Sequence, residues 1–136
     1  ILSVKLSVYQ EEIAARDRVA ARYGARLANL VEVPFVPDGY ESVWAQYTVK
    51  LQSSQERKAV QAHLAQIGIP TAVYYPTPLH KQTVYRDYPA DPQGLSTAES
   101  LSEQVMSLPM HPYLAEDVQD RIIEGVAAAV VAVRKA

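Results

Sequence analysis

The sequence predicts an α+β domain in which a small three-stranded sheet carries flanking helices and follows a long N-terminal helix. Three observations favour this class. Apolar residues recur with helical spacing at both ends of the chain, over residues 1–28 and from about 115 to 134. Three short runs with strand character, 43–51, 71–75 and 105–108, are separated by helical patterns. The 136 residues fit one domain, and no internal repeat divides them.

The first helix is expected over residues 1–28. Its apolar face repeats at helical intervals and contains Leu2, Leu6, Tyr9, Ile13, Ala20 and Leu27. The chain starts at Ile1 inside this pattern, without a methionine or a residue that would cap a helix. We therefore expect Ile1 to lie within a longer helix and the chain to be part of a larger protein.

Residues 43–51 alternate between apolar and polar side chains and predict the first strand. Ser53 and Glu56 then have the spacing of a capping box, which predicts the start of a second helix. Gly68 is expected at the C′ position that ends this helix. The helix is expected to bury Val60, Leu64 and Ile67.

The second strand is predicted over 71–75, where β-branched and aromatic residues follow one another until prolines end the ladder. It brings Tyr74, Tyr75 and, shortly afterwards, His80 onto a stiff loop beyond its C-terminal end. Ligand contacts are common at such places in folds that combine strands and helices. Because neighbouring strand residues alternate, Tyr74 and Tyr75 are expected on opposite faces.

The last third of the chain predicts a short helix, a strand and a long helix. Ser96 and Glu99 repeat the capping-box spacing, so a short helix is expected from Ser96 to about residue 101. The third strand, 105–108, is expected between the other two and antiparallel to both, which gives a split βαβ layer. The last helix is expected to bury Val118, Ile122, Val126, Ala129 and Val133.

Composition argues against several classes of function. The net charge of −2 gives no basic excess, so no nucleic-acid partner is expected. No apolar stretch approaches the about 18 residues of a membrane span, and no signal peptide is evident. The absence of cysteine removes thiolate metal sites and cysteine nucleophiles, and it is compatible with a reducing compartment.

The histidines His63, His80 and His111 do not have the spacing of a metal site with a third ligand, so no metal is expected. No glycine-rich phosphate loop and no catalytic serine motif is present. Physical reasoning alone leaves two interpretations of Tyr74, Tyr75 and His80. They are contacts for a ligand, or they are ordinary strand and loop residues.

Four stretches, in this order, resemble the C-terminal domain of the DegT/DnrJ/StrS-type nucleotide-sugar aminotransferases. They are Ser-Val-Trp-Ala-Gln-Tyr at 42–47, Gly-Ile-Pro-Thr at 68–71, Tyr-Tyr-Pro-Thr-Pro-Leu-His-Lys-Gln at 74–82, and Leu-Pro-Met-His-Pro at 108–112. The closest likeness is to enzymes that aminate a UDP-linked 3-keto-glucuronic acid derivative. The resemblance implies the C-terminal domain of an aspartate-aminotransferase-type fold. Residues 1–136 would form this small domain, with 1–28 as an interdomain helix and 40–136 as the sheet domain.

The same resemblance implies an enzyme that uses pyridoxal phosphate (PLP), acts as a homodimer in the cytoplasm, and serves polysaccharide biosynthesis. It would move an amino group from an amino acid, expected to be glutamate, to a keto group of a nucleotide-linked sugar. Tyr74, Tyr75 and His80 correspond to substrate contacts of the family, whereas no catalytic or cofactor-binding residue is expected in this chain. None of its lysines stands in the family's Schiff-base motif, so the isolated chain is expected to be inactive; they are Lys5, Lys50, Lys58, Lys81 and Lys135. The alternative is a stand-alone, non-catalytic ligand-binding or interaction module.

Overall fold

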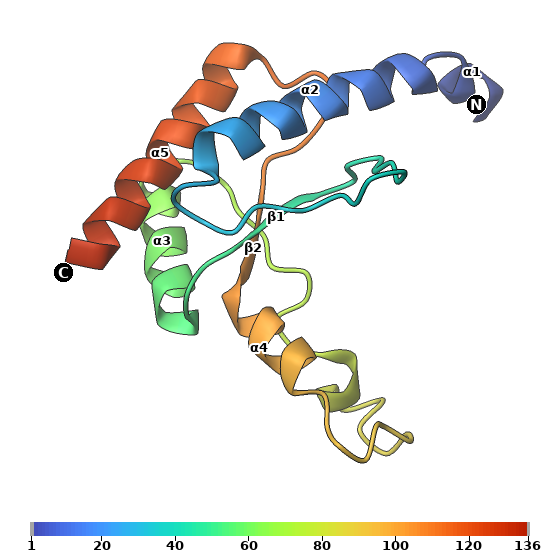
Figure 1. The fold of residues 1–136 in the computed structure, drawn as a ribbon, viewed down its shortest axis with the longest axis vertical. Coiled ribbons are helices and arrows are strands. Elements are labelled where there is room, and N and C mark those ends of the chain that lie inside the picture. Colours follow the sequence, from blue (N-terminus) through green and yellow to red (C-terminus); the bar gives the residue numbers. More distant parts are fainter. Residues whose placement is uncertain (1, 136) are drawn as a thin grey trace.

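The computed structural model describes residues 2–135, except for the side chain of Leu2. Ile1, which we expected inside a longer helix, lies outside the described residues. In chain order the elements are α1 (Leu2–Ser7), α2 (Tyr9–Leu27), β1 (Tyr47–Lys50), α3 (Ser54–Gln66), the 3₁₀ helix η1 (Leu79–Lys81), α4 (Ser96–Gln104), β2 (Val105–Leu108) and α5 (Glu116–Lys135). In Figure 1, α2, α3 and α5 gather around the small sheet, whereas α4 and the loop before it extend away from this body.

The sheet consists of β1 and β2, which pair antiparallel from Tyr47 opposite Leu108 to Lys50 opposite Val105. The predicted bounds of the 105–108 strand are confirmed. Its predicted central position is also confirmed, because an antiparallel bridge joins Ser107 to Ala72 on the side away from β1. The predicted strand over 71–75 is wrong, since this bridge is all that forms there. The backbone bends at Tyr74, and the prolines that follow have no N–H to donate to a ladder.

The predicted strand over 43–51 is also too long. Trp44 has a positive φ of 47° and the chain bends at Ala45, so regular pairing starts only at Tyr47. Tyr47 is nevertheless buried, and Trp44 is half-buried against the core. An antiparallel bridge between Glu32 and Lys50, which the sequence pattern did not predict, adds a further extended residue beside β1.

The predicted helix over 1–28 is broken at Val8 into α1 and α2. Its predicted apolar face is only partly buried. Ala20 and Leu27 lie in the core, whereas Leu6 and Tyr9 are exposed. In Figure 1, α1 and the start of α2 extend beyond the sheet, so this end of the predicted face lies away from the core.

The predicted cap at the start of α3 is confirmed. Ser53 Oγ accepts a 3.1 Å hydrogen bond from the backbone N–H of Glu56, and the Glu56 carboxylate accepts one of 2.6 Å from the N–H of Gln52. The side chain of Glu56 is buried and its other oxygen accepts from Arg134 of α5 at 2.7 Å. This cap therefore also fixes the end of α5 against α3.

Gly68 ends α3 as predicted, with a positive φ of 73° that disfavours any residue with a Cβ atom. Its N–H donates to the carbonyl of Ala65, and the N–H of Ile69 donates to the carbonyl of Leu64. This is the Schellman pattern, and Ile69 and Leu64 are both buried in the core. The expected burial of Ile67 is wrong, because the turn leaves Ile67 exposed and buries Ile69.

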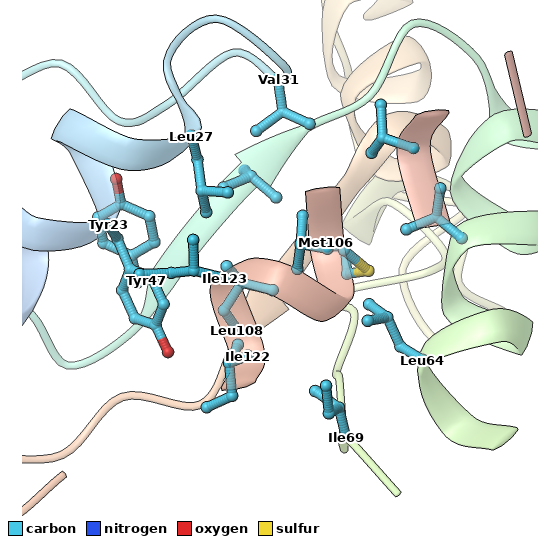
Figure 2. Packing of buried hydrophobic residues seen from close by; sticks show 14 of the residues in the cluster. Tyr23, Leu27, Val31, Tyr47, Leu64, Ile69, Met106, Leu108, Ile122 and Ile123 are labelled. Carbon is cyan, nitrogen blue, oxygen red and sulfur yellow. The ribbon is translucent and has the colours of Figure 1, made fainter. Parts of the chain in front are cut away.

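Helix α5 supplies the largest part of the core. Ile122, Val126 and Ala129 are buried as predicted and Val133 packs partly against the core, but Val118 is exposed. Figure 2 shows Ile122 and Ile123 of this helix among Tyr23, Tyr47, Leu64, Ile69 and Met106, which come from elements far apart in the sequence. None of the helices within residues 2–135 is long and apolar enough to cross a membrane.

Candidate functional site

A cavity of about 1110 Å³ lies between the sheet and the arm formed by η1, the loop after it and α4. Its lining combines aromatic and apolar side chains with a few polar tips, as in sites for small organic ligands. The lining residues are Thr48, Tyr74, Tyr75, Thr77, Pro78, Leu79, His80, Gln82, Tyr85, Tyr88, Pro89, Ala90, Leu95, Ala98, Leu101, Ser102 and Val105. The structure thus brings Tyr74, Tyr75 and His80, all predicted from the sequence, to one cavity.

Tyr74 and Tyr75 both line this cavity, so the expectation that they lie on opposite faces of a strand is wrong. Their ring centroids are 6.0 Å apart with an angle of 78° between the planes, and the peptide bond between them is cis. Both rings are exposed, at 50% for Tyr74 and 71% for Tyr75. Tyr74 also lines a second cavity of about 270 Å³, beside Ser107 and Pro109. Both phenol groups are therefore accessible to a ligand.

Two hydroxyl groups form a hydrogen bond between the strands on the sheet side of the cavity. Thr48 Oγ1 of β1 and Ser107 Oγ of β2 lie 2.8 Å apart, on opposite strands of the antiparallel pair. Thr48 lines the large cavity and Ser107 the smaller one. This hydrogen bond joins a lining residue of one cavity to a lining residue of the other across the two strands.

The outer wall is a loop that turns on itself after η1. Gln82 Nε2 donates a 3.2 Å hydrogen bond to the carbonyl of Thr77, which closes the turn around η1. The N–H of Tyr85 donates to the carbonyl of Gln82, and the rings of Tyr85 and Tyr88 lie with centroids 6.0 Å apart. These contacts place two further tyrosines on the cavity, which the sequence interpretation missed because they follow no strand or motif.

His80 lies on η1 and is tied to α4 by a carboxylate. Its Nε2 atom is 3.0 Å from Oε1 of Glu99, and Nζ of Lys81 is 2.6 Å from Oε2 of the same side chain. The hydrogen bond from Lys81, followed by that from His80, lowers the pKa of Glu99 below its ordinary value.

The prediction that Ser96 and Glu99 form a capping box is wrong. Leu95 precedes the first residue of α4, no side chain caps the helix, and the helix continues to Gln104. The carboxylate that would have completed the capping box binds His80 and Lys81 instead.

The other two histidines are not lining residues of the cavity. His63 is half-buried on α3, and His111 is exposed beyond β2. Within residues 2–135 no group of three histidine, aspartate or glutamate side chains comes together in a way that could hold a metal ion.

A model of the DegT/DnrJ/EryC1/StrS aminotransferase family matches residues 1–127. The UDP-2-acetamido-2-deoxy-3-oxo-D-glucuronate aminotransferase of Pseudomonas aeruginosa is 46% identical over 115 residues, which are 84% of this chain and 30% of that protein.

Solved structures agree with this likeness. A DegT DnrJ EryC1 StrS aminotransferase from Brucella abortus superposes with a TM-score of 0.89 at 44% identity, over 94% of this chain and 34% of that one. DesV of S. venezuelae, in complex with a ketimine intermediate, gives a TM-score of 0.87 at 30% identity, over 95% and 34%. This chain spans about a third of the length of these relatives.

Proposed function

Because this chain belongs to the DegT/DnrJ/EryC1/StrS aminotransferase family, we propose that residues 1–136 form the C-terminal domain of an aminotransferase for nucleotide-linked sugars. In this proposal residues 1–28 connect to the rest of the enzyme, and residues 40–136 form the domain proper. The acceptor is a UDP-linked 3-keto sugar of the glucuronic acid type, and the donor is glutamate. The similarity to the UDP-2-acetamido-2-deoxy-3-oxo-D-glucuronate aminotransferase of Pseudomonas aeruginosa supports this choice of acceptor.

The family implies PLP, and we propose that the described residues 2–135 of this chain do not form its binding site. PLP needs a lysine for its Schiff base and donors for its phosphate group. The large cavity has neither a lysine nor an arginine in its lining. Lys81, beside it, is bound to Glu99, and Lys50 is bound to Glu32 at 2.7 Å. We propose that another part of the enzyme holds the cofactor, and that this chain alone has no transaminase activity.

The role that we propose for this chain is to bind and orient the sugar nucleotide. The observation that carries it is the position of Tyr74, Tyr75 and His80 on one cavity. Two phenol groups and an imidazole can donate and accept hydrogen bonds, as recognition of sugar hydroxyls requires. The apolar faces of Tyr85 and Tyr88 provide surface against which a sugar or base ring can pack.

We further propose that the enzyme is a homodimer of the cytoplasm that serves polysaccharide biosynthesis, as the family resemblance implies. The exposed apolar side chains of residues 4–9 support the proposal that this segment is buried against another part of such an assembly. Several apolar side chains are exposed there, and they are Val4, Leu6, Val8 and Tyr9. Exposed apolar surface of this kind is typical of protein interfaces.

The test uses the full-length protein that contains this chain, purified with PLP. It is mixed with glutamate and a UDP-linked 3-keto sugar, and 2-oxoglutarate and the amino sugar are measured together. Equal amounts of both products are expected. A reaction without the sugar serves as the control. Binding of the sugar nucleotide without any amino transfer would contradict the proposal and favour the non-catalytic ligand-binding module.

A further inference from the structure

Glu99 lies in the first turn of α4, and its carboxylate holds two consecutive residues of η1. One oxygen is 3.0 Å from Nε2 of His80 and the other is 2.6 Å from Nζ of Lys81. His80 lines the large cavity, whereas Glu99 does not. In Figure 1, α4 runs beside the segment that contains η1. Glu99 therefore reaches a ligand in the cavity only through His80.

The charge of Glu99 fixes which ring nitrogen of His80 carries the proton. Both hydrogen bonds lower the pKa of Glu99, so its carboxylate is ionised at neutral pH and can only accept. The Nε2 atom of His80 must then donate. In a neutral imidazole with its proton on Nε2, the Nδ1 atom is a hydrogen-bond acceptor.

We propose that Glu99 is a positioning residue that holds His80 with its proton on Nε2, so that Nδ1 accepts a hydrogen bond from a hydroxyl or N–H group of the sugar substrate. Lys81 assists by holding the second carboxylate oxygen, which prevents Glu99 from rotating away. This inference rests on the proposed function, because it deepens the role of His80 in binding the sugar. In this way Glu99 makes the site prefer a substrate that has a hydrogen-bond donor opposite Nδ1 of His80.

The first test measures steady-state and half-reaction kinetics of the full-length enzyme loaded with PLP. Glu99→Ala is expected to raise the KM for the sugar nucleotide about 3- to 10-fold, the effect of losing one neutral hydrogen bond. The half-reaction with glutamate should change less than about twofold, because the donor does not meet His80 in this proposal. Glu99→Gln keeps a side-chain oxygen that can accept from Nε2 and should restore most of the affinity.

Glu103→Ala is the matched control. Glu103 is an exposed carboxylate on the same helix and does not line the cavity. Its kinetics should equal those of the wild type. Equal KM values for Glu99→Ala and Glu103→Ala would overturn the proposal.

The second test observes the tautomer directly. Full-length protein is labelled with ¹⁵N-histidine, and the His80 signals are identified as those lost in His80→Gln. A single species with its proton on Nε2 is expected in the wild type, and a mixture of tautomers in Glu99→Ala. A wild-type proton on Nδ1 would overturn the inference. Absent transaminase activity in the wild type would instead refute the proposed function, while the spectrum still decides how Glu99 acts on His80.

Discussion

The hydroxyl group of Tyr23 on α2 donates a 2.9 Å hydrogen bond to the carbonyl oxygen of Pro109, the residue that follows β2. The Tyr23 ring is completely buried and lies 5.0 Å, centroid to centroid, from that of Tyr47 on β1. One tyrosine thus connects the N-terminal helix to both strands of the sheet. Figure 2 shows the two rings side by side at the edge of the core.

Tyr23→Phe should lower the free energy of unfolding by about 1–3 kcal/mol, because it leaves the Pro109 carbonyl without its donor. Urea unfolding of the 136-residue chain measures this loss. Tyr40→Phe is the control, since Tyr40 is 74% exposed and its change should be within about 0.5 kcal/mol. An equal midpoint for both variants would show that the buried hydrogen bond does not stabilise the fold.

Gly68→Ala should destabilise the chain by about 1–2 kcal/mol, because an alanine is strained at the positive φ of 73° that ends α3. The midpoint of thermal unfolding, followed by circular dichroism at 222 nm, is expected to fall by several degrees. Gly68→Asn should lose less, since asparagine tolerates this conformation better. The prediction fails if alanine and asparagine at this position have the same effect.

Tyr75→Phe should lower kcat/KM for the sugar nucleotide about 2- to 12-fold if the phenol binds a neutral group, and up to about 100-fold if it binds a charged one. The half-reaction with glutamate and the melting temperature should stay unchanged, since the ring remains and is 71% exposed. Tyr40→Phe again supplies the control. Unchanged sugar kinetics in Tyr75→Phe would remove this residue from the substrate site.

Alkaline pH should destabilise the chain through its buried tyrosines. Burial raises the pKa of Tyr47 to about 12 and that of Tyr23 further in the same direction. Above a pH of about 10 the unfolded chain therefore loses these protons while the folded chain keeps them. The free energy of unfolding falls as the pH rises, by at most about 1.4 kcal/mol per unit for each tyrosine.

Urea unfolding between pH 8 and 11 tests this expectation. Tyr47→Phe should make the decline above pH 10 shallower, because it removes one of the buried tyrosines that bind their protons more tightly in the folded chain. Ultraviolet absorbance at 295 nm reports the ionisation directly. A decline of equal slope in the wild type and the variant would exclude Tyr47 as a cause.

The two capping patterns illustrate what local sequence can predict. Ser53 and Glu56 cap α3 as their spacing indicates, since all the groups involved lie within a few residues. Ser96 and Glu99 have the same spacing but do not form a cap. The Glu99 side chain instead binds His80, 19 residues earlier. The sequence pattern contains no information on this partner, because the partner depends on how η1 packs on α4.

The strands also show that local sequence does not determine which segments pair in the sheet. The bounds of β2 were predicted correctly, since the run Val-Met-Ser-Leu is closed by a proline. The run over 71–75 has equal strand propensity, yet only Ala72 pairs with the sheet. Its tyrosines lie on the cavity instead of in a ladder. The role of these tyrosines as substrate contacts stays a prediction, whereas the strand that was predicted to carry them is wrong.

Helix α4 continues into β2 without a linking residue, since Gln104 ends the helix and Val105 begins the strand. The rotation of the helix about its axis is therefore coupled to the register of the strand. One inserted residue at this junction would turn α4 by about 100° and move Glu99 away from η1, or it would reverse the two faces of β2. We therefore expect a change in length at this junction to disturb the cavity more than a substitution does.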